Sequence, residues 1–219
     1  SIVGVEALAR WPKSSPRELP PGRFIPVAEE HGLIDSLSAL ILGIACRDMV
    51  QWHDLKLAVN ISPVQIANPQ LVPDIIRIAG EAGLPLHRLE VEFTESVLIR
   101  NPARAKQVIR ELQGLGVTVA LDDFGTGYAS VGYLREYGFN KIKLDRSLTH
   151  SISTDIAAQQ VVQGTILIAK GLSANIIAEG VETEEEAQLM RLSGCNQLQG
   201  FYFGRPQAAT ALGSLLGSE

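Results

Sequence analysis

The sequence predicts an α/β fold in which short strands alternate with longer helices, the arrangement of a (β/α)8 TIM-type barrel. Two observations lead to this prediction. Runs of β-branched and apolar residues alternate with helical hydrophobic periodicity, and a polar residue stands near the end of each strand. The count is seven strands, and the chain starts directly in one, so we expect the barrel to lack its first strand and opening helix. The predicted strands are residues 2–8, 56–62, 89–95, 118–123, 141–145, 175–180 and 197–203.

Helices are expected between these strands, with residues 14–22 as a loop. Several of the helices run up to a glycine, which favours the left-handed turn that ends a helix. Thr183, with Glu186 three residues later, matches a capping box at a helix start. The predicted helices are residues 34–52, 70–82, 103–115, 129–137, 153–170 and 184–192.

Composition indicates one globular domain over residues 1–219. Hydrophobic residues make up 46% of the 219 residues and charged residues 20%, which excludes a disordered chain. The net charge of −5, without a basic tract, argues against DNA or RNA as a partner. Two cysteines make no disulfide scaffold, and the longest apolar stretch, near residues 37–46, is too short to cross a bilayer. We therefore expect a cytoplasmic protein without membrane insertion.

Polar side chains recur at the ends of the predicted strands. In three strands a small residue stands two positions before the polar one, on the same face, which suits the crowded interior of a barrel below a polar rim. A single charged residue at a strand end is ordinary in a solvated loop. A polar or charged residue at the end of all seven predicted strands indicates a functional site. The residues are Glu6, Asn60, Glu92, Asp122 with Asp123, Lys143 with Asp145, Glu179, and Gln199.

Several carboxylates at one rim repel each other, and hard divalent cations relieve that repulsion. Mg²⁺ and Mn²⁺ prefer carboxylate and carbonyl oxygens, whereas no cluster of cysteine and histidine indicates zinc. The adjacent pair Asp122–Asp123 is typical of acids that bridge two metals, although such pairs also occur in turns. Lys143 could neutralise charge, orient a water or form a Schiff base. Arg10 is placed to clamp a phosphate, unless it pairs with a surface acid.

The same residues resemble the signature of the EAL domain family, the phosphodiesterases of bacterial cyclic di-GMP. The resemblance begins at Glu6-Ala7-Leu8-Ala9-Arg10-Trp11 and extends, in order, to Arg205-Pro206. Eight linked motifs in one order make it specific, and it covers nearly the whole chain. Phe24-Ile25-Pro26 with Ala28-Glu29-Glu30 counts as one motif, and so does the last, Gln199-Gly200 with Arg205-Pro206. The others after the first are Val59-Asn60-Ile61-Ser62, Glu92-Phe93-Thr94-Glu95, Asp122-Asp123-Phe124-Gly125-Thr126-Gly127-Tyr128, Lys143-Leu144-Asp145-Arg146-Ser147 and Ala178-Glu179-Gly180-Val181-Glu182-Thr183.

The resemblance implies two metal ions, Mg²⁺ or Mn²⁺, with Ca²⁺ as an inhibitor. It implies that Glu95 anchors the loop of residues 123–130, which couples the metals to a dimer interface. Lys143 would contact the attacking water, Arg10 a substrate phosphate, and Gln199 would support the site. One metal would be held by Glu6, Asn60, Glu92 and Asp122, the other by Asp122, Asp123 and Glu179; guanine or supporting contacts are expected from Asp145, Glu182 and Pro206.

The implied reaction is hydrolysis of one phosphodiester bond of cyclic di-GMP to linear 5′-pGpG, by in-line displacement at phosphorus. The implied partners are the substrate, a second copy of the chain, and a sensory or GGDEF-type domain in the parent protein. A domain that binds cyclic di-GMP without cutting it is the alternative, although all the expected ligands are present. A Schiff-base lyase that uses Lys143 is a further alternative, but it has no need of so many carboxylates.

Overall fold

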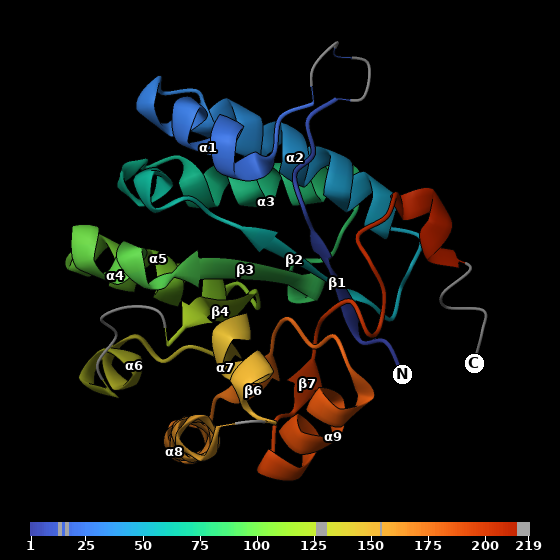
Figure 1. Cartoon of the computed structure of the whole chain (residues 1–219). Coiled ribbons are helices and arrows are strands. Elements are labelled where there is room, and N and C mark those ends of the chain that lie inside the picture. The colour runs from blue at the N-terminus through green and yellow to red at the C-terminus, as the bar shows by residue number, and fades with distance from the viewer. Residues whose placement is uncertain (13–14, 16–17, 126–130, 154, 214–219) are drawn as a thin grey trace. The chain divides into compact units, whose positions relative to one another are not determined.

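The computed structural model describes residues 1–12, 15, 18–125, 131–153 and 155–213 (Figure 1). Seven strands are hydrogen-bonded in the order in which they follow one another along the chain, β1 to β7. The chain divides into two compact units, and each is described by itself. The first comprises Ser1–Val91, Glu111–Thr118 and Gln207–Glu219, and the second Glu92–Arg110 and Val119–Pro206.

The described part of the first unit contains the parallel strands β1 and β2 and the helices α1, α2 and α3. Strand β1 pairs with β2, and Glu6 lies opposite Ala58 in the register. Helix α2 packs against both α1 and α3 (Figure 1). Its elements are β1 (Gly4–Ala7), α1 (Pro21–Glu30), α2 (Ile34–Met49), β2 (Lys56–Asn60), the 3₁₀ turns η1 (Pro63–Ala67), η2 (Leu86–Arg88) and η3 (Ala209–Ala211), α3 (Leu71–Ala82), and the first half of β3 (Leu89–Thr94).

A buried arginine joins the end of α2 to the start of β2. The guanidinium of Arg88 donates to the carbonyl oxygens of Met49 at 2.8 Å and Leu55 at 3.0 Å, and also to that of Trp52. Arg88 is only 6% exposed. The carbonyl oxygens of Met49 and Trp52 also accept backbone amides, from Trp52 and Leu55, so Arg88 adds second hydrogen bonds that hold this turn together.

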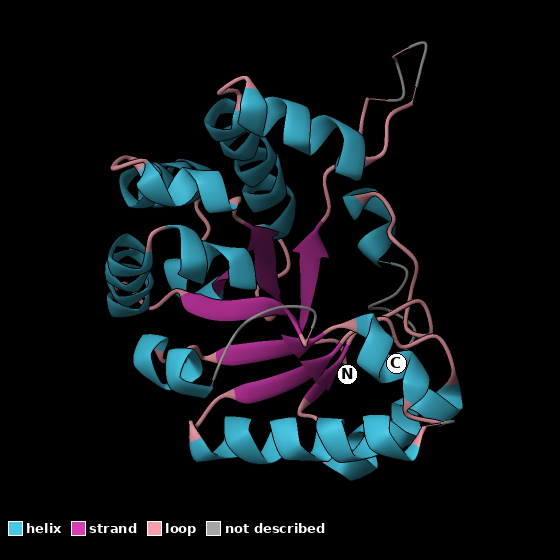
Figure 2. Cartoon of the chain, turned by 60° about the vertical axis from the view of Figure 1, so that its left-hand side comes forward, coloured by secondary structure: helices cyan, strands magenta, loops and turns pink. Residues whose placement is uncertain are grey.

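The second unit continues the alternation of strands and helices. Strands β4 with β5, β5 with β6, and β6 with β7 pair in parallel, with the connecting helices outside the strands (Figure 2). This parallel β/α order confirms the TIM-like fold class. The elements are the second half of β3, α4 (Glu95–Arg100), α5 (Pro102–Gly114), β4 (Thr118–Phe124), α6 (Val131–Tyr137), β5 (Lys141–Leu144), α7 (Arg146–Ser151), α8 (Ile156–Gly171), β6 (Asn175–Ala178), α9 (Glu184–Ser193) and β7 (Gln197–Leu198).

The helices differ from the sequence prediction mainly by three additions, α1, α4 and α7. The capping box at the start of α9 is confirmed, with Thr183 and Glu186 each bonded to the other's backbone. Strand β7 is much shorter than predicted, because the chain turns at Gly200. A Cβ atom there would lie 2.1 Å from the carbonyl oxygen of Val181, so only glycine permits this close approach.

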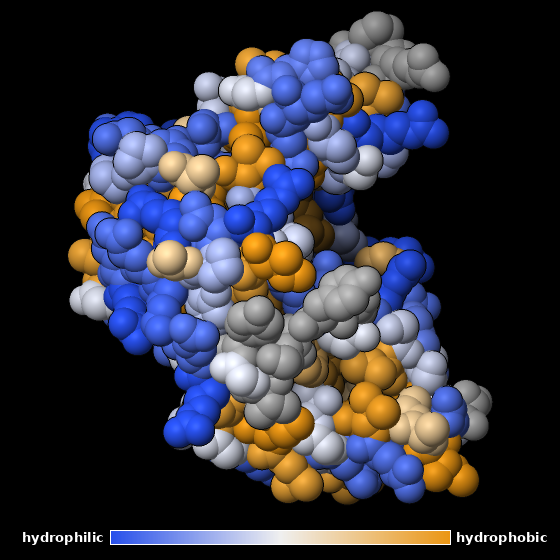
Figure 3. Space-filling view, turned by 90° about the vertical axis from the view of Figure 1, so that its left-hand side faces the viewer, coloured by the Kyte–Doolittle hydropathy of each residue, from blue (hydrophilic) through white to orange (hydrophobic). Residues whose placement is uncertain are grey.

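Exposed hydrophobic residues are scattered between hydrophilic ones on the face shown in Figure 3. The most exposed in the second unit are Leu192 at 85%, Ile156 at 73% and Leu167 at 70%. Single exposed apolar side chains are normal for a folded protein. Among the described residues, none of the helices has the length and apolar character that crossing a membrane requires.

Candidate metal centre

In the first unit, the ends of β1 and β2 bring Glu6 and Asn60 together. The Nδ2 atom of Asn60 donates a hydrogen bond of 2.6 Å to Oε1 of Glu6. Gly4, two residues before Glu6, leaves little room for a side chain, because a Cβ atom would meet the carbonyl oxygen of Lys56 at 3.0 Å. The predicted pattern of a small residue below a polar one is thus present in this strand. The amide oxygen and the carboxylate both belong to the donor classes that Mg²⁺ and Mn²⁺ prefer.

A polar network supports the turn that follows Asn60. Ser62 donates its hydroxyl to Oε1 of Glu29 in α1, at 2.5 Å, and its own amide donates to Oε1 of Gln65. Gln65 is 3% exposed and donates to Asp35 of α2. Glu29 and Ser62 belong to motifs that the sequence singled out without assigning them a role, whereas Gln65 and Asp35 had no signal in the sequence. The network fixes the backbone that carries Asn60.

In the second unit, Lys143 lies at the centre of a carboxylate cluster. Its Nζ atom is 2.8 Å from Oε2 of Glu92, 3.2 Å from Oδ1 of Asp122 and 2.7 Å from Oε1 of Glu179. The lysine is 1% exposed, Glu92 2% and Asp122 8%. Three strands, β3, β4 and β5, and the residue after β6 supply these side chains. The structure therefore brings together four of the residues that the sequence placed at strand ends.

A β-bulge explains how two adjacent acids reach one site. Leu121 pairs with Ile142 and Phe124 with Leu144, so Asp122 and Asp123 stand opposite the single residue Lys143. In a regular strand, neighbouring side chains point to opposite faces. Here Asp123 adopts a φ of 55°, in the left-handed region that aspartate tolerates better than most residues.

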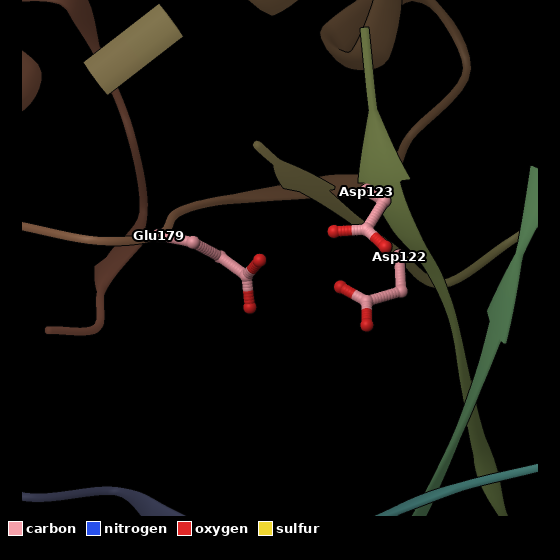
Figure 4. Close-up of side chains that lie close together, drawn as sticks. All are labelled: Asp122, Asp123 and Glu179. Atoms are coloured by element: carbon pink, nitrogen blue, oxygen red, sulfur yellow. The ribbon is translucent and has the colours of Figure 1, made fainter. Parts of the chain in front are cut away.

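The bulge turns both aspartates toward Glu179 (Figure 4). One ligand atom from each of Asp122, Asp123 and Glu179 can be chosen so that all three lie within 4.8 Å of one another. Asp122 is buried, Glu179 half-buried and Asp123 exposed. The three carboxylates therefore form an open, oxygen-only donor set.

Among the described residues, carboxylates outnumber the ammonium group in this cluster. Glu92, Asp122 and Glu179 lie within 3.2 Å of the Nζ atom of Lys143, and Asp123 lies beside Asp122 and Glu179. Burial of several like charges is unfavourable unless cations compensate them. All donors are hard oxygens, and divalent cations of the Mg²⁺ class fit such a set.

Glu95 follows β3 and begins α4. It is 7% exposed, and its Oε1 accepts a hydrogen bond of 3.3 Å from the amide of Gly125, directly after the bulged strand. The start of the loop predicted to depend on Glu95 is thus attached to it. Residues 126–130 of that loop lie outside the described residues.

The remaining predicted residues have the following positions. Arg10 is exposed and donates to the carbonyl oxygen of Ala9, within the first unit. In the second unit, Gln199 is half-buried after β7, and Glu182 and Pro206 are exposed. Asp145 accepts a hydrogen bond from the amide of Ser147 and caps α7. Burial would raise the pKa of Asp145, but the hydrogen bonds from Ser147 and Arg146 hold that pKa below its ordinary value.

Known proteins resemble the chain in sequence and fold. The cyclic di-GMP phosphodiesterase PA2567 of Pseudomonas aeruginosa is 37% identical over 208 residues, covering 93% of this chain and 35% of the relative. A complex of the PaMucR phosphodiesterase with c-di-GMP superposes with a TM-score of 0.91 at 35% identity, covering 97% of this chain and 88% of that one. A manganese and cyclic di-GMP complex of Klebsiella pneumoniae BlrP1 gives a TM-score of 0.83 at 28% identity, covering 93% and 52%.

The chain spans between 26% and 36% of the length of the curated relatives that it matches. The family model described as "EAL domain" matches residues 1–206. The acids predicted from strand ends lie within this matched range, and the chain belongs to the EAL domain family.

Proposed function

We propose that the chain hydrolyses one phosphodiester bond of cyclic di-GMP to linear 5′-pGpG, with the help of two divalent cations. The observation that carries the proposal is the carboxylate cluster of the described residues: three acids surround the buried ammonium group of Lys143, and two of them form an oxygen donor set with Asp123. An acidic site without cations would repel a dianionic dinucleotide. Relatives named as cyclic di-GMP phosphodiesterases support the choice of substrate.

The proposed metal ligands are those that the family resemblance implies. One cation would be held by Glu6, Asn60, Glu92 and Asp122, and the other by Asp122, Asp123 and Glu179. When bound, the two cations would stabilise the negative charge that develops on the phosphoryl oxygens. We propose Mg²⁺ or Mn²⁺ as the working ions and Ca²⁺ as an inhibitor. Ca²⁺ favours longer bonds and more ligands than this compact set offers.

The protein's own side chains would orient the reactants. Lys143 is held by three carboxylates, and we propose that its ammonium group donates to the attacking water and keeps the water in line with phosphorus. Arg10 would hold a phosphate oxygen, Gln199 would support the site, and Glu182 would contact guanine. The same supporting or guanine contacts are proposed for Asp145 and Pro206.

The proposed reaction balances without a further reactant. The water oxygen forms a bond to phosphorus, and the bond from phosphorus to the 3′ oxygen breaks. One water proton ends on the released 3′ hydroxyl. The product is the linear dinucleotide with a 5′ phosphate.

The test is incubation of the chain with cyclic di-GMP and Mg²⁺ or Mn²⁺, followed by chromatography of the products. We expect pGpG with either metal, no product with EDTA, and no product from Asp122→Asn. The matched control is Glu136→Gln, because Glu136 is an exposed acid on α6 that pairs with Lys106. Loss of activity in the control as well would mean that Asp122→Asn acts through folding.

Two other functions are outcomes of the same experiment. If the chain binds cyclic di-GMP but forms no pGpG with either metal, it is a receptor domain and not an enzyme. Turnover that survives EDTA would contradict the metal mechanism and would return the Schiff-base role of Lys143 to consideration.

The setting of the domain is also a proposal. The curated relatives are about three times longer or more, which supports fusion to a sensory or GGDEF-type domain. We propose a homodimer that works in the cytoplasm, where its proposed nucleotide substrate is made. Sedimentation of the chain at several concentrations tests the dimer.

A further inference from the structure

We propose that His150 is a positioning residue that, through Glu186, holds the loop between β6 and α9 in place. This loop carries Glu179 and Glu182, so the inference rests on the proposed function of those two acids. Nothing in the strand-end pattern points to His150, which lies on the short helix α7.

The loop is attached to its surroundings by backbone amides. The amide of Glu179 donates to the carbonyl oxygen of Leu144, and the amide of Val181 to that of Gln199. The amides of Glu182 and Thr183 both donate to one carboxylate oxygen, Oε2 of Glu186, at 2.7 and 3.1 Å. One side chain therefore accounts for half of these four attachments.

The other oxygen of Glu186 binds His150. The Nδ1 atom of His150 lies 2.8 Å from Oε1 of Glu186. Because the carboxylate can only accept when it is ionised, Nδ1 must carry the proton and donate. Burial would raise the pKa of Glu186, but the hydrogen bonds from His150, Glu182 and Thr183 hold it below its ordinary value, so the group is ionised at neutral pH.

Helix α7 contacts the loop at a second point, one helical turn earlier. A Cβ atom on Gly180 would lie 2.3 Å from the Cβ atom of Arg146, and Gly180 has a φ of 66°. Arg146 and His150 are four residues apart and therefore share one face of the helix. That face therefore meets the loop at Gly180 through Arg146 and, through His150, at Glu186.

The two contacts differ in what they can specify. The contact at Gly180 is steric and sets how closely the loop approaches α7. The bond from His150 fixes the direction of the Glu186 carboxylate, and with it the amides on both sides of the Glu182 side chain. Partners that orient metal ligands indirectly typically change metal affinity or activity by about 10- to 100-fold. Since His150 acts through Glu186 and the loop, we expect the lower end of this range.

The test compares His150→Phe with His150→Asn. Phenylalanine keeps the ring but has no donor, whereas the amide nitrogen of asparagine can occupy the place of Nδ1. The side chain of His150 is 40% exposed, so neither change forces a large void or a buried clash. Three measurements apply to both variants: hydrogen exchange of individual amides by NMR, Mn²⁺ affinity by calorimetry, and kcat with KM for cyclic di-GMP.

We expect His150→Phe to accelerate exchange of the Glu182 and Thr183 amides by about tenfold and to weaken Mn²⁺ binding by a similar factor. Exchange of the Ile176 amide inside β6 serves as the control and should not change. His150→Asn should restore all three quantities to within about twofold of the parent, a rescue that a purely space-filling role would not give.

Two results would overturn the inference. In the first, His150→Phe has the same amide exchange rates and Mn²⁺ affinity as the parent chain. In the second, His150→Phe and His150→Asn lose Mn²⁺ affinity and amide protection equally. Failure of the inference is distinguishable from failure of the proposed function. A parent chain that makes no pGpG would contradict hydrolysis, while amide exchange would still decide the role of His150. An active parent with unchanged His150→Phe would contradict the positioning role alone.

Discussion

Replacement of Lys143 by methionine tests the role of the buried ammonium group. The change keeps a long side chain in a position that is 1% exposed, but it removes the cation from between Glu92, Asp122 and Glu179. Removing one partner of a buried ion pair typically costs about 3–5 kcal/mol, because the remaining charges stay buried without compensation. We expect Lys143→Met to lose this amount of unfolding free energy when EDTA is present.

Divalent cations should return part of the lost stability. A ligand at 100 times its Kd adds about 2.7 kcal/mol to the folded state. Urea unfolding of parent and variant, with EDTA and with saturating Mn²⁺, measures both effects. In Mn²⁺, the folded variant should bind cyclic di-GMP but turn it over at least about 100-fold more slowly, since the group that orients the water is gone.

Lys141→Met is the matched control for loss of a buried lysine on the same strand. Lys141 is 7% exposed, and its Nζ atom donates to Gln197 at 3.0 Å. It should lose stability without a comparable loss of kcat. The reasoning is refuted if Lys143→Met is as stable as the parent in EDTA, or if the two variants lose kcat equally.

Three further predictions concern stability. Arg88→Met removes three hydrogen bonds to carbonyl oxygens, two of them buried, and should lower the free energy of unfolding in urea by about 3 kcal/mol. A loss below about 1 kcal/mol would show that the hydrogen bonds of Arg88 add little to the backbone partners of these oxygens. Gly180→Ala should lower the free energy of unfolding by at least about 2 kcal/mol, because the new Cβ atom would collide with Arg146. Gly138→Ala is the control and should cost about 1 kcal/mol, because Gly138 has a similar φ but open space around it. Equal shifts of the two urea midpoints would contradict the collision. Because the pKa of Glu186 is lowered from 4.5 in the folded state, its contribution to stability is present above pH 4.5 and is lost as the pH falls through the folded value. Glu186→Gln should therefore flatten the acid side of the stability profile, and an unchanged slope would count against this interpretation.

Most strands could be predicted from the sequence, because each is a short apolar run between turn residues. The additional helices could not, for local reasons. Helix α1 begins at Pro21 and contains Pro26, which obscures its periodicity. Helices α4 and α7 have only six residues each and start directly where a strand ends, so no periodic pattern develops. Three consecutive aromatic residues, 201–203, follow β7 and favour a strand, but the close contact of Gly200 with Val181 turns the chain away.

The acids of the site could be found from their places at strand ends, but their geometry could not. Simple alternation would separate Asp122 from Asp123, and only the pairing with β5 reveals the bulge that joins them. The three ion pairs of Lys143 likewise depend on contacts between residues far apart in the sequence. Glu186 could be found as a capping residue, whereas its bond to His150 had no signal in the sequence.

The central claim is that these carboxylates hold divalent cations against the phosphodiester of cyclic di-GMP. A crystal structure with cyclic di-GMP and Ca²⁺, which should bind without supporting turnover, tests this claim most directly. We predict two cations, both bound to Asp122, with Asp123 and Glu179 on one of them and a substrate phosphate oxygen as a shared ligand. Cyclic di-GMP bound without cations at these acids, or cations bound elsewhere, would contradict the account.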